Sequence, residues 1–155
     1  MGLSGGEGEE RVADLLGTHS YQLDQKGRIS LPVRFREAFA DGAYLTLGQD
    51  GCLFCFPSAE WVERTAELRS SPLSDAEGRA LARIFFGNAE QVDLDSQGRL
   101  VIPQRLRAAV GLKKEAVVLG VNDRLEIWDR DAHERYQESF GGAYLAGSLL
   151  PGRRP

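Results

Sequence analysis

The sequence predicts an α+β protein, mainly β, in which two tandem strand–strand–helix–strand–strand units pack around a pseudo-twofold axis. The main observation is an internal repeat: LDQKGRISLP at Leu23–Pro32 returns as LDSQGRLVIP at Leu94–Pro103. After one inserted residue the match resumes, with Tyr44–Gly48 against Ala116–Gly120. Self-similarity at a fixed period indicates repeated structural units, and so short a unit buries little surface alone. We therefore expect the two copies to pack together or to exchange strands.

Each copy begins with a strand, a turn and a returning strand. YQLD and QVDLD alternate apolar and polar residues, as a half-buried strand does. In the turn, Asp24 and Asp95 can hydrogen-bond the backbone ahead of them, and Gly27 and Gly98 tolerate a positive φ. RISL and RLVI form the returning strands, so each copy is predicted to open with a hairpin.

A short helix and a second hairpin complete each copy. Pro32 and Pro103 suit the first turn of a helix, and the apolar residues after them recur at helical spacing. AYLTLG with GCLFCF, and EAVVLG with DRLEIW, predict the second hairpins. Pro72 separates two helices between the copies, and a matching helix near Asp131–Phe140 follows the second copy.

The predicted organisation has six segments. They are a flexible N-terminal extension (1–16), the first repeat (17–57), a helical connector (58–86), the second repeat (87–130), a C-terminal helix (131–146) and a flexible tail (147–155). Hydrophobic residues make up 42% of the chain and charged residues 27%, which fits a soluble globular protein. No apolar run approaches the roughly 18–20 residues that cross a bilayer, and the N-terminus lacks the features of a secretory signal. We therefore expect a cytoplasmic protein with no membrane partner.

The distribution of charge matters more than its total. The net charge of −4 argues against nucleic acid as a partner. However, residues 24–36 carry +3 and residues 95–107 carry +2, so the remainder of the chain carries −9. Positive charge is thus concentrated in the duplicated segment, which predicts contact with a polyanion.

The turns supply candidate DNA-binding residues. Glycine in a hairpin tip lets the backbone approach a phosphate, and the adjacent Arg28 and Arg99 can pair bidentately with phosphate or with guanine. We expect Lys26, Arg34 and Arg105 to add phosphate contacts. The plainer interpretation is solvated arginines on ordinary hairpins. Recurrence in both copies favours a functional role, because nothing in the predicted fold requires Arg28.

Other chemistry finds little support in the sequence. Cys52 and Cys55 form a C-x-x-C, but they lie on a predicted strand rather than at a helix start, where a redox motif would have them. His19 and His133 lack metal-ligand spacing and belong to no recognisable triad. No glycine-rich phosphate loop of Walker or dinucleotide type is present. The sequence therefore predicts no catalytic residues, metal, cofactor or small-molecule substrate, and a protein that is not an enzyme.

The chain resembles the MraZ family of bacterial transcriptional regulators. The resemblance runs over about Gly17–Phe140 and rests on LDQKGRISLPVRFRE, on DLDSQGRLVIPQRLRAAVGLKKEAVVLGVNDRLEIWD, and on the paired elements Asp24/Arg28 and Asp95/Arg99. The family's Lys-Gly-Arg is kept in the first copy, whereas the second has Gln-Gly-Arg, which suggests unequal contributions from the two halves.

The resemblance implies a fold and a function. The fold is a pair of AbrB-like swapped-hairpin halves, interleaved within one chain into a pseudo-twofold barrel, and the chains assemble into a ring of identical subunits. The function is binding to double-stranded DNA at short G-rich direct repeats upstream of the division and cell-wall gene cluster that contains the family's own gene. A repressor associated with the nucleoid is expected, with Arg28 and Arg99 as the residues that carry over.

One alternative comes from a different class of protein. Swapped-hairpin folds also serve as oligomerisation or protein-binding modules, as in antitoxins, without specific DNA recognition. Salt dependence separates the two, because DNA binding weakens steeply as salt rises.

Overall fold

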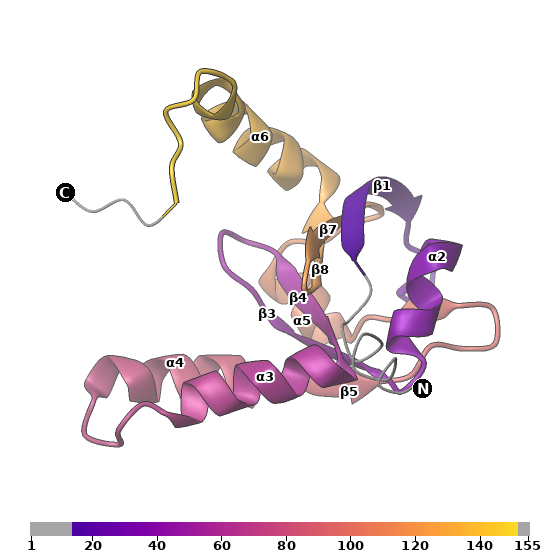
Figure 1. Cartoon of the computed structure of the whole chain (residues 1–155). Helices are drawn as coiled ribbons and strands as arrows, with labels where there is room; N and C mark the ends of the chain where they lie inside the picture. The colour runs from indigo at the N-terminus through magenta and orange to yellow at the C-terminus, as the bar shows by residue number, and fades with distance from the viewer. Residues whose placement is uncertain (1–13, 152–155) are drawn as a thin grey trace, which may run out of the picture.

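The computed structural model describes residues 14–151, so most of the predicted flexible extension (1–16) and the end of the predicted tail (147–155) lie outside the described residues, whereas Leu15 and Leu16 begin the first strand. The chain is a mixed α/β protein whose strands are mostly short and antiparallel (Figure 1). Its elements are β1 (Leu15–Gln22), β2 (Arg28–Ser30), α2 (Val33–Arg36), the 3-10 turn η1 (Glu37–Phe39), β3 (Ala43–Leu47), β4 (Leu53–Pro57), α3 (Ser58–Arg69), α4 (Ala76–Gly87), β5 (Glu90–Val92), β6 (Arg99–Val101), α5 (Gln104–Ala109), β7 (Glu115–Asn122), β8 (Leu125–Asp129) and α6 (Arg130–Leu145).

The strands form two sheets. Six of them run in the order β1-β7-β8-β4-β3-β5, every pair antiparallel, and β2 pairs with β6 in a separate two-stranded ribbon. The larger sheet has β1 and β5 as free edges, so it is not closed and the expected barrel is not confirmed.

The opening hairpins predicted for each copy are wrong, because these strands pair with the other copy. β1 pairs with β7 instead of β2, β5 pairs with β3 instead of β6, and β2 and β6 pair with each other. The exchange has a clear physical reason, since it places Ile29 of one copy opposite Leu100 of the other, and both side chains are fully buried. Burial of apolar surface that neither copy could cover alone stabilises the exchanged pairing.

The second hairpin of each copy is confirmed, with one change of register. Tyr44 pairs with Phe56 in β3–β4, whereas Val117 pairs with Trp128 in β7–β8. Phe56 and Trp128 hold equivalent positions in the two copies, at the ends of LFCF and LEIW, so Val117, not Ala116, is the structural counterpart of Tyr44. The turn of the second hairpin is one residue shorter than that of the first. Leu125 of β8 therefore again corresponds to Leu53 of β4.

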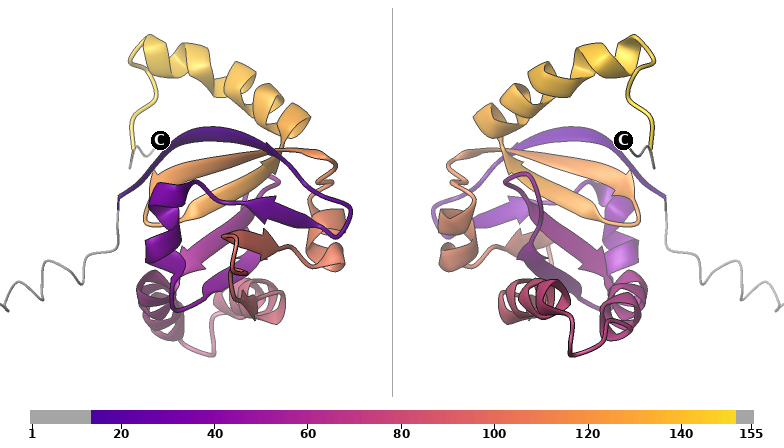
Figure 2. Two further views of the ribbon diagram at one scale, coloured as in Figure 1. Left: turned by 90° about the vertical axis from the view of Figure 1, so that its right-hand side faces the viewer. Right: turned by 90° about the vertical axis from the view of Figure 1, so that its left-hand side faces the viewer.

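The core lies on one face of the six-stranded sheet, between the two copies. Phe35 of α2 and Leu106 of α5 enter it from opposite copies, and both are buried. The other face carries a smaller cluster around Trp128, which α6 covers, while α3 and α4 cover the β3–β4 side. In both figures α6 lies at one end of the molecule and the pair α3–α4 at the other (Figures 1 and 2). Among residues 14–151, no helix has the length and apolarity needed to cross a bilayer.

Candidate nucleic-acid interface at the two turns

The turn before β2 is built around one carboxylate. Asp24 Oδ1 accepts hydrogen bonds from the backbone N–H groups of Lys26 and Arg28, both at 2.9 Å. Its other oxygen, Oδ2, accepts from Arg28 Nε at 2.6 Å. The backbone hydrogen bond from Arg28 is the main cause that lowers the pKa of the Asp24 carboxyl below its usual range. The carboxylate therefore fixes both the turn and the arginine beside it.

The turn before β6 repeats this arrangement. Asp95 Oδ1 accepts from the backbone N–H groups of Gln97 and Arg99, both at 2.9 Å, and Oδ2 accepts from Arg99 Nε at 2.8 Å. The pKa of Asp95 is lowered for the same reason, chiefly by the backbone N–H of Arg99. Glycine in the left-handed region completes each turn, with φ of 75° at Gly27 and 77° at Gly98.

The ribbon of β2 and β6 brings the two arginines to one face. Arg28 lies opposite Val101 and Arg99 lies opposite Ser30. Opposed residues in an antiparallel pair point to the same side, and neighbours along a strand alternate. The two arginines therefore share the face opposite the buried pair of Ile29 and Leu100. Standard strand spacing puts the Cα atoms of the arginines about 8 Å apart.

Each turn is backed by an arginine from the other repeat. The Arg107 guanidinium lies against Gly27, and the Arg36 guanidinium lies against Gly98. Nε of Arg36 donates to Leu31 O at 3.0 Å, and Nε of Arg107 donates to Ile102 O at 2.9 Å. Neither Arg36 nor Arg107 is among the residues predicted from the sequence, although they hold equivalent positions in the two copies. Their position depends on the strand exchange, which the sequence pattern does not specify.

The structure does not bring Arg34 and Arg105 into the turns. Arg34 Nη2 donates to Leu16 O at 2.9 Å and lies 3.2 Å from His19 Nε2, on β1. Arg105 forms an ion pair of 2.8 Å with Glu90 of β5 and also donates to Asn88. Arg34 and Arg105 therefore contact β1 and β5, the strands that precede the two turns. Lys26, in contrast, is exposed, and its ammonium makes no hydrogen bond or ion pair within residues 14–151.

The fold does use Arg28 and Arg99, which the sequence alone did not indicate. Each forms an ion pair with the aspartate four residues before it. The Arg28 side chain nevertheless keeps 26% of its surface exposed and Arg99 keeps 27%, so these pairs are partly solvated and weak as sources of stability. A guanidinium has five N–H donors, of which only Nε is directed at the aspartate. Among residues 14–151, the terminal amino groups of both arginines remain available to another partner.

The two cysteines of the C-x-x-C do not share a site in the structure. Cys55 lies in the core and Cys52 lies in the cluster on the opposite face of the sheet, so the two thiols point apart. Burial raises the pKa of Cys52 to about 12 and also raises the pKa of Cys55, which keeps both thiols protonated. Across residues 14–151, no three His, Cys, Asp or Glu side chains gather as a group that could hold a metal ion.

Comparison with known proteins agrees with the duplicated architecture. The family described as "MraZ protein, putative antitoxin-like" matches this chain twice, at residues 15–84 and 85–143. A protein of Pelotomaculum thermopropionicum named transcriptional regulator MraZ is 42% identical over 129 residues, covering 83% of this chain and 89% of that protein. Proteins with the same name from Thermobifida fusca and Paenarthrobacter aurescens are 42% and 46% identical, and cover 88% and 83% of this chain and 97% and 90% of their own lengths. With its resemblance confirmed over both repeats, this chain belongs to the MraZ family.

Proposed function

We propose that this protein is a transcriptional regulator that binds double-stranded DNA through the turns before β2 and β6. The observation that carries the proposal is the placement of Arg28 and Arg99 on one exposed face of the ribbon, each held by an aspartate. The names of the relatives support the regulatory role, because each is called a transcriptional regulator. A two-stranded ribbon has the dimensions that enter the major groove.

The aspartates prepare the arginines for binding. An arginine free in solution loses side-chain entropy when it is immobilised on DNA, at a cost of about 0.5–1.5 kcal/mol. Asp24 and Asp95 hold the guanidinium groups in the free protein. Part of the side-chain entropy is therefore already lost before DNA binds. The terminal amino groups then donate to guanine O6 and N7, which is the commonest specific contact of arginine in the major groove.

The surrounding cations hold the DNA backbone. Lys26 and Arg107 flank the first turn, and Arg36 flanks the second. We assign phosphate contacts to these residues, because phosphate contacts set the position of a protein on DNA while base contacts set its specificity. Arg34 and Arg105 add positive charge at the edges of the same region. The first turn has one more cation than the second, so we expect it to contribute more to affinity.

The spacing of the arginines defines the length of the DNA site that one chain contacts. A separation of about 8 Å corresponds to two or three base pairs at roughly 3.4 Å per step. A short run of guanines fits this length. We propose that the site is a short G-rich direct repeat in the protein's own promoter, within the division and cell-wall gene cluster, and that binding represses it. The resemblance to the MraZ family supports this choice.

Binding several repeats at once requires several chains. One chain offers few cations, and its net charge is −4. We propose that the chains assemble into a closed ring that presents several AbrB-like exchanged ribbons to successive repeats. Linking the sites raises the effective concentration of each turn near its repeat, which multiplies weak individual affinities.

A second candidate function is a protein-binding module of the antitoxin type. The family description contains the term antitoxin-like, and the structure exposes large apolar side chains on its helices. Such a module needs no arginine directed at the exposed face of the ribbon, so the turns favour DNA.

A fluorescence-anisotropy titration with labelled DNA from immediately upstream of the gene tests the proposal. We expect binding whose log–log salt dependence has a slope near −0.9 per phosphate contacted. Arg28→Ala/Arg99→Ala should weaken binding about 10-fold or more and lessen the preference over scrambled DNA. Arg69→Ala/Arg83→Ala, which removes two exposed arginines from α3 and α4, is the matched control. Equal binding by the double variant and the control would reject the assignment.

A further inference from the structure

The three lysines of the chain all lie around the turn before β2. Lysine and arginine together number 19, and the lysines among them are Lys26, Lys113 and Lys114. Lys26 belongs to the turn itself, between Asp24 and Gly27. Lys113 and Lys114 come much later in the sequence, in the connection from α5 to β7. The fold therefore gathers these three residues into one place, which we call the lysine corner.

A backbone contact joins the two parts of the lysine corner. The N–H of Leu23 donates to the carbonyl of Lys114 at 2.8 Å, which continues the pairing of β1 with β7 (Figure 2). Opposed residues of an antiparallel pair point to the same side of the sheet. Leu23 is buried in the core together with Ile29 of the ribbon. Lys114 therefore begins on the side of the sheet where the ribbon lies, and its side chain is exposed.

The ammonium groups of the corner are largely open to solvent. Like that of Lys26, the ammonium of Lys114 makes no hydrogen bond or ion pair within residues 14–151. Nζ of Lys113 lies 3.9 Å from Asp129 Oδ2, and 73% of the lysine side chain is exposed. Glu115 and Asp129 oppose the three lysines, which leaves the corner with a net charge of +1. An ammonium on a flexible stem is a point charge suited to phosphate.

The equivalent corner beside the turn before β6 has different residues. Gln97 takes the place of a lysine in the turn. Continuing the antiparallel pairing of β3 with β5 by two residues places Asp41 opposite Leu94. Leu94 is the counterpart of Leu23 in the repeat. Asp41 therefore holds the place that Lys114 has at the first turn.

Asp93 adds a second negative charge to this corner. A Cβ on Gly42 would lie 3.3 Å from Asp93 Oδ1, so the carboxylate lies beside the start of β3. The counterpart of Asp93 in the first copy is the neutral Gln22. Asp41 and Asp93 are both exposed, and they give this corner a charge of −2. The two turns thus share one Asp–Arg geometry and differ in the sign of the charge beside it.

We propose that the lysine corner binds the DNA backbone on one side of the site only, so that each chain docks on the duplex in a single direction. The inference rests on the DNA binding proposed above and names the residues that orient it. A ribbon with a pseudo-twofold axis presents the same two arginines after a rotation of 180°, and the backbone of a duplex has the same symmetry. Arg28 and Arg99 alone therefore allow two opposite dockings.

The charge difference between the corners selects one of these dockings. Phosphates attract the lysine corner, whereas Asp41 and Asp93 repel phosphates at the other turn. Phosphate contacts set the position and orientation of a protein on DNA even though they carry no base specificity. A direct repeat has a direction, so a chain that docks in one direction suits it.

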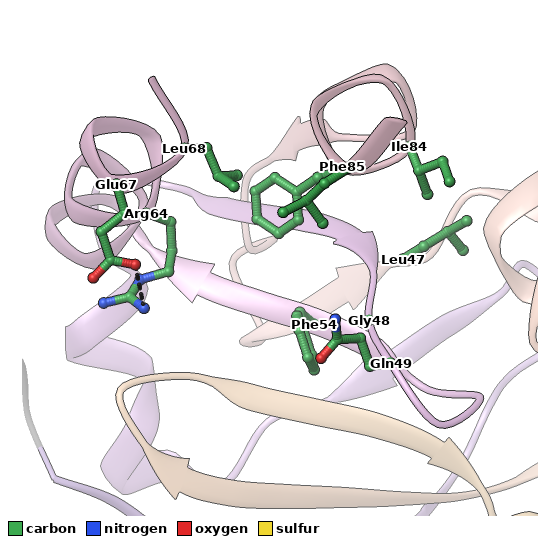
Figure 3. Close-up of a pocket in the computed structure, with 10 residues that line it drawn as sticks. Leu47, Gly48, Gln49, Phe54, Arg64, Glu67, Leu68, Ile84 and Phe85 are labelled. Carbon is green, nitrogen blue, oxygen red and sulfur yellow. Dashed lines mark ion pairs between the residues drawn. The ribbon is translucent and has the colours of Figure 1, made fainter. Parts of the chain in front are cut away.

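The helical ends of the molecule supply the control for this proposal. Arg64 of α3 pairs with Glu67 at 3.0 Å, beside an apolar groove of about 340 Å³ under α3 and α4 (Figure 3). Arg69, Arg83 and Arg135 are exposed on α3, α4 and α6, away from both turns. Replacing these three arginines with glutamine therefore makes the same change in net charge as replacing the three lysines.

Shortening the DNA from either end tests the direction of docking. Anisotropy is measured with duplexes that carry one repeat and are trimmed stepwise on one flank or the other. We expect the wild-type protein to lose affinity when one flank is trimmed and to keep it when the other is trimmed. Lys26→Gln/Lys113→Gln/Lys114→Gln should bind about 10-fold or more weakly on the full duplex, lower the salt slope by about 1 per lysine that contacts phosphate, and respond equally to both flanks.

Three results would overturn the proposal. They are equal sensitivity of the wild-type protein to both flanks, equal binding by the lysine variant and Arg69→Gln/Arg83→Gln/Arg135→Gln, and a flank preference that the lysine variant keeps. If the wild-type protein binds no DNA, or binds it independently of Arg28 and Arg99, the proposed function itself fails. If binding needs both arginines but not the lysines, the function stands and the direction of docking fails.

The reverse substitution and a chemical footprint complete the test. Asp41→Lys/Gln97→Lys creates a basic corner at the second turn, so the difference between the flanks should shrink while affinity rises. An unchanged flank difference would contradict the role of these positions. The lysines are the side chains with primary amines, so acetylation followed by peptide mass spectrometry reports on this corner alone. Bound single-repeat duplex should protect all three lysines, and unchanged acetylation would overturn the contact.

Discussion

Gly27 lies directly against the guanidinium of Arg107, a residue of the other repeat. A Cβ at Gly27 would lie 2.8 Å from Arg107 Cζ, and Gly27 also has a positive φ of 75°. The backbone conformation disfavours any side chain here, and a Cβ would also displace the guanidinium of Arg107. The turn is therefore shaped by residues from both halves of the chain.

Replacing this glycine should cost more than its conformation alone explains. Gly27→Ala carries the penalty of a positive φ, about 1–2 kcal/mol, and also displaces Arg107. Gly111→Ala is the control, because Gly111 has a φ of 62° and open space around it. We expect the free energy of unfolding, measured in urea, to fall further for Gly27→Ala. Equal losses would show that Arg107 moves away freely.

Neutralising an aspartate in the turn should weaken DNA binding, although it removes a negative charge from the binding face. Asp95→Asn loses the carboxylate that holds Arg99 Nε. Freeing one long side chain should reduce affinity about 2- to 10-fold. Asp93→Asn makes the same charge change two residues earlier and should leave affinity equal or slightly higher. Stronger binding by Asp95→Asn, measured by anisotropy at fixed salt, would mean that long-range charge outweighs positioning.

The turns should resist acid better than ordinary aspartates allow. The folded-state pKa values of Asp24 and Asp95 are lowered, so their stabilising contribution is fully present above the usual aspartate range. The contribution is lost as the pH falls through the lowered values. NMR titration of the backbone amides of Lys26 and Gln97 should therefore show midpoints below that range. Midpoints at the unperturbed value would contradict the hydrogen bonding described above.

The two cysteines should be unreactive in the folded protein. The pKa of Cys52 is about 12 and that of Cys55 is also raised, so neither forms a thiolate near neutral pH. We expect less than one thiol per chain to react with a chromogenic disulfide reagent at pH 8, and two in denaturant. Rapid reaction of a native thiol would show that the sheet opens around it.

Phe85 should anchor α4 to the rest of the fold. Its ring packs against those of Phe56 and Trp61, and its carbonyl accepts a 2.5 Å hydrogen bond from the buried Thr46 hydroxyl. Phe85→Ala should lower the free energy of unfolding by about 3 kcal/mol, in the range for buried aromatic residues. Leu73→Ala, at an 86% exposed position, should change it by no more than about 0.5 kcal/mol. Urea unfolding followed by tryptophan fluorescence measures both.

The sequence predicts the elements of this protein better than it predicts their partners. Alternation of apolar and polar residues identifies a strand and its buried face, as it does for Ile29 and Leu100. It does not say which strand lies alongside. The hairpins β3–β4 and β7–β8 follow from short turns, whereas β1–β7 and β2–β6 join residues that are far apart in sequence.

The same distinction applies to the candidate site. Asp24 and Arg28 contact each other within one turn, so their relationship is local and their recurrence reveals it. Arg36 and Arg107 reach the turns across the exchange, and only the fold brings them there. The sequence predicts Arg34 as a phosphate contact from its charge alone, and that prediction is not tested by its hydrogen bond to Leu16 O on β1, which the charge pattern could not reveal.

The strand exchange also bears on how the chain folds. Leu15 pairs with Asn122, so the first strand of the large sheet cannot find its partner until nearly the whole chain has been synthesised. The ribbon between the halves must likewise wait for Arg99–Val101. Long-range pairing of this kind slows folding, because the chain loses conformational entropy on loop closure before the stabilising contacts form. An interrupted first repeat would leave Ile29 and its apolar neighbours without their cover. The core therefore cannot form until translation has passed β7, which ends at Asn122.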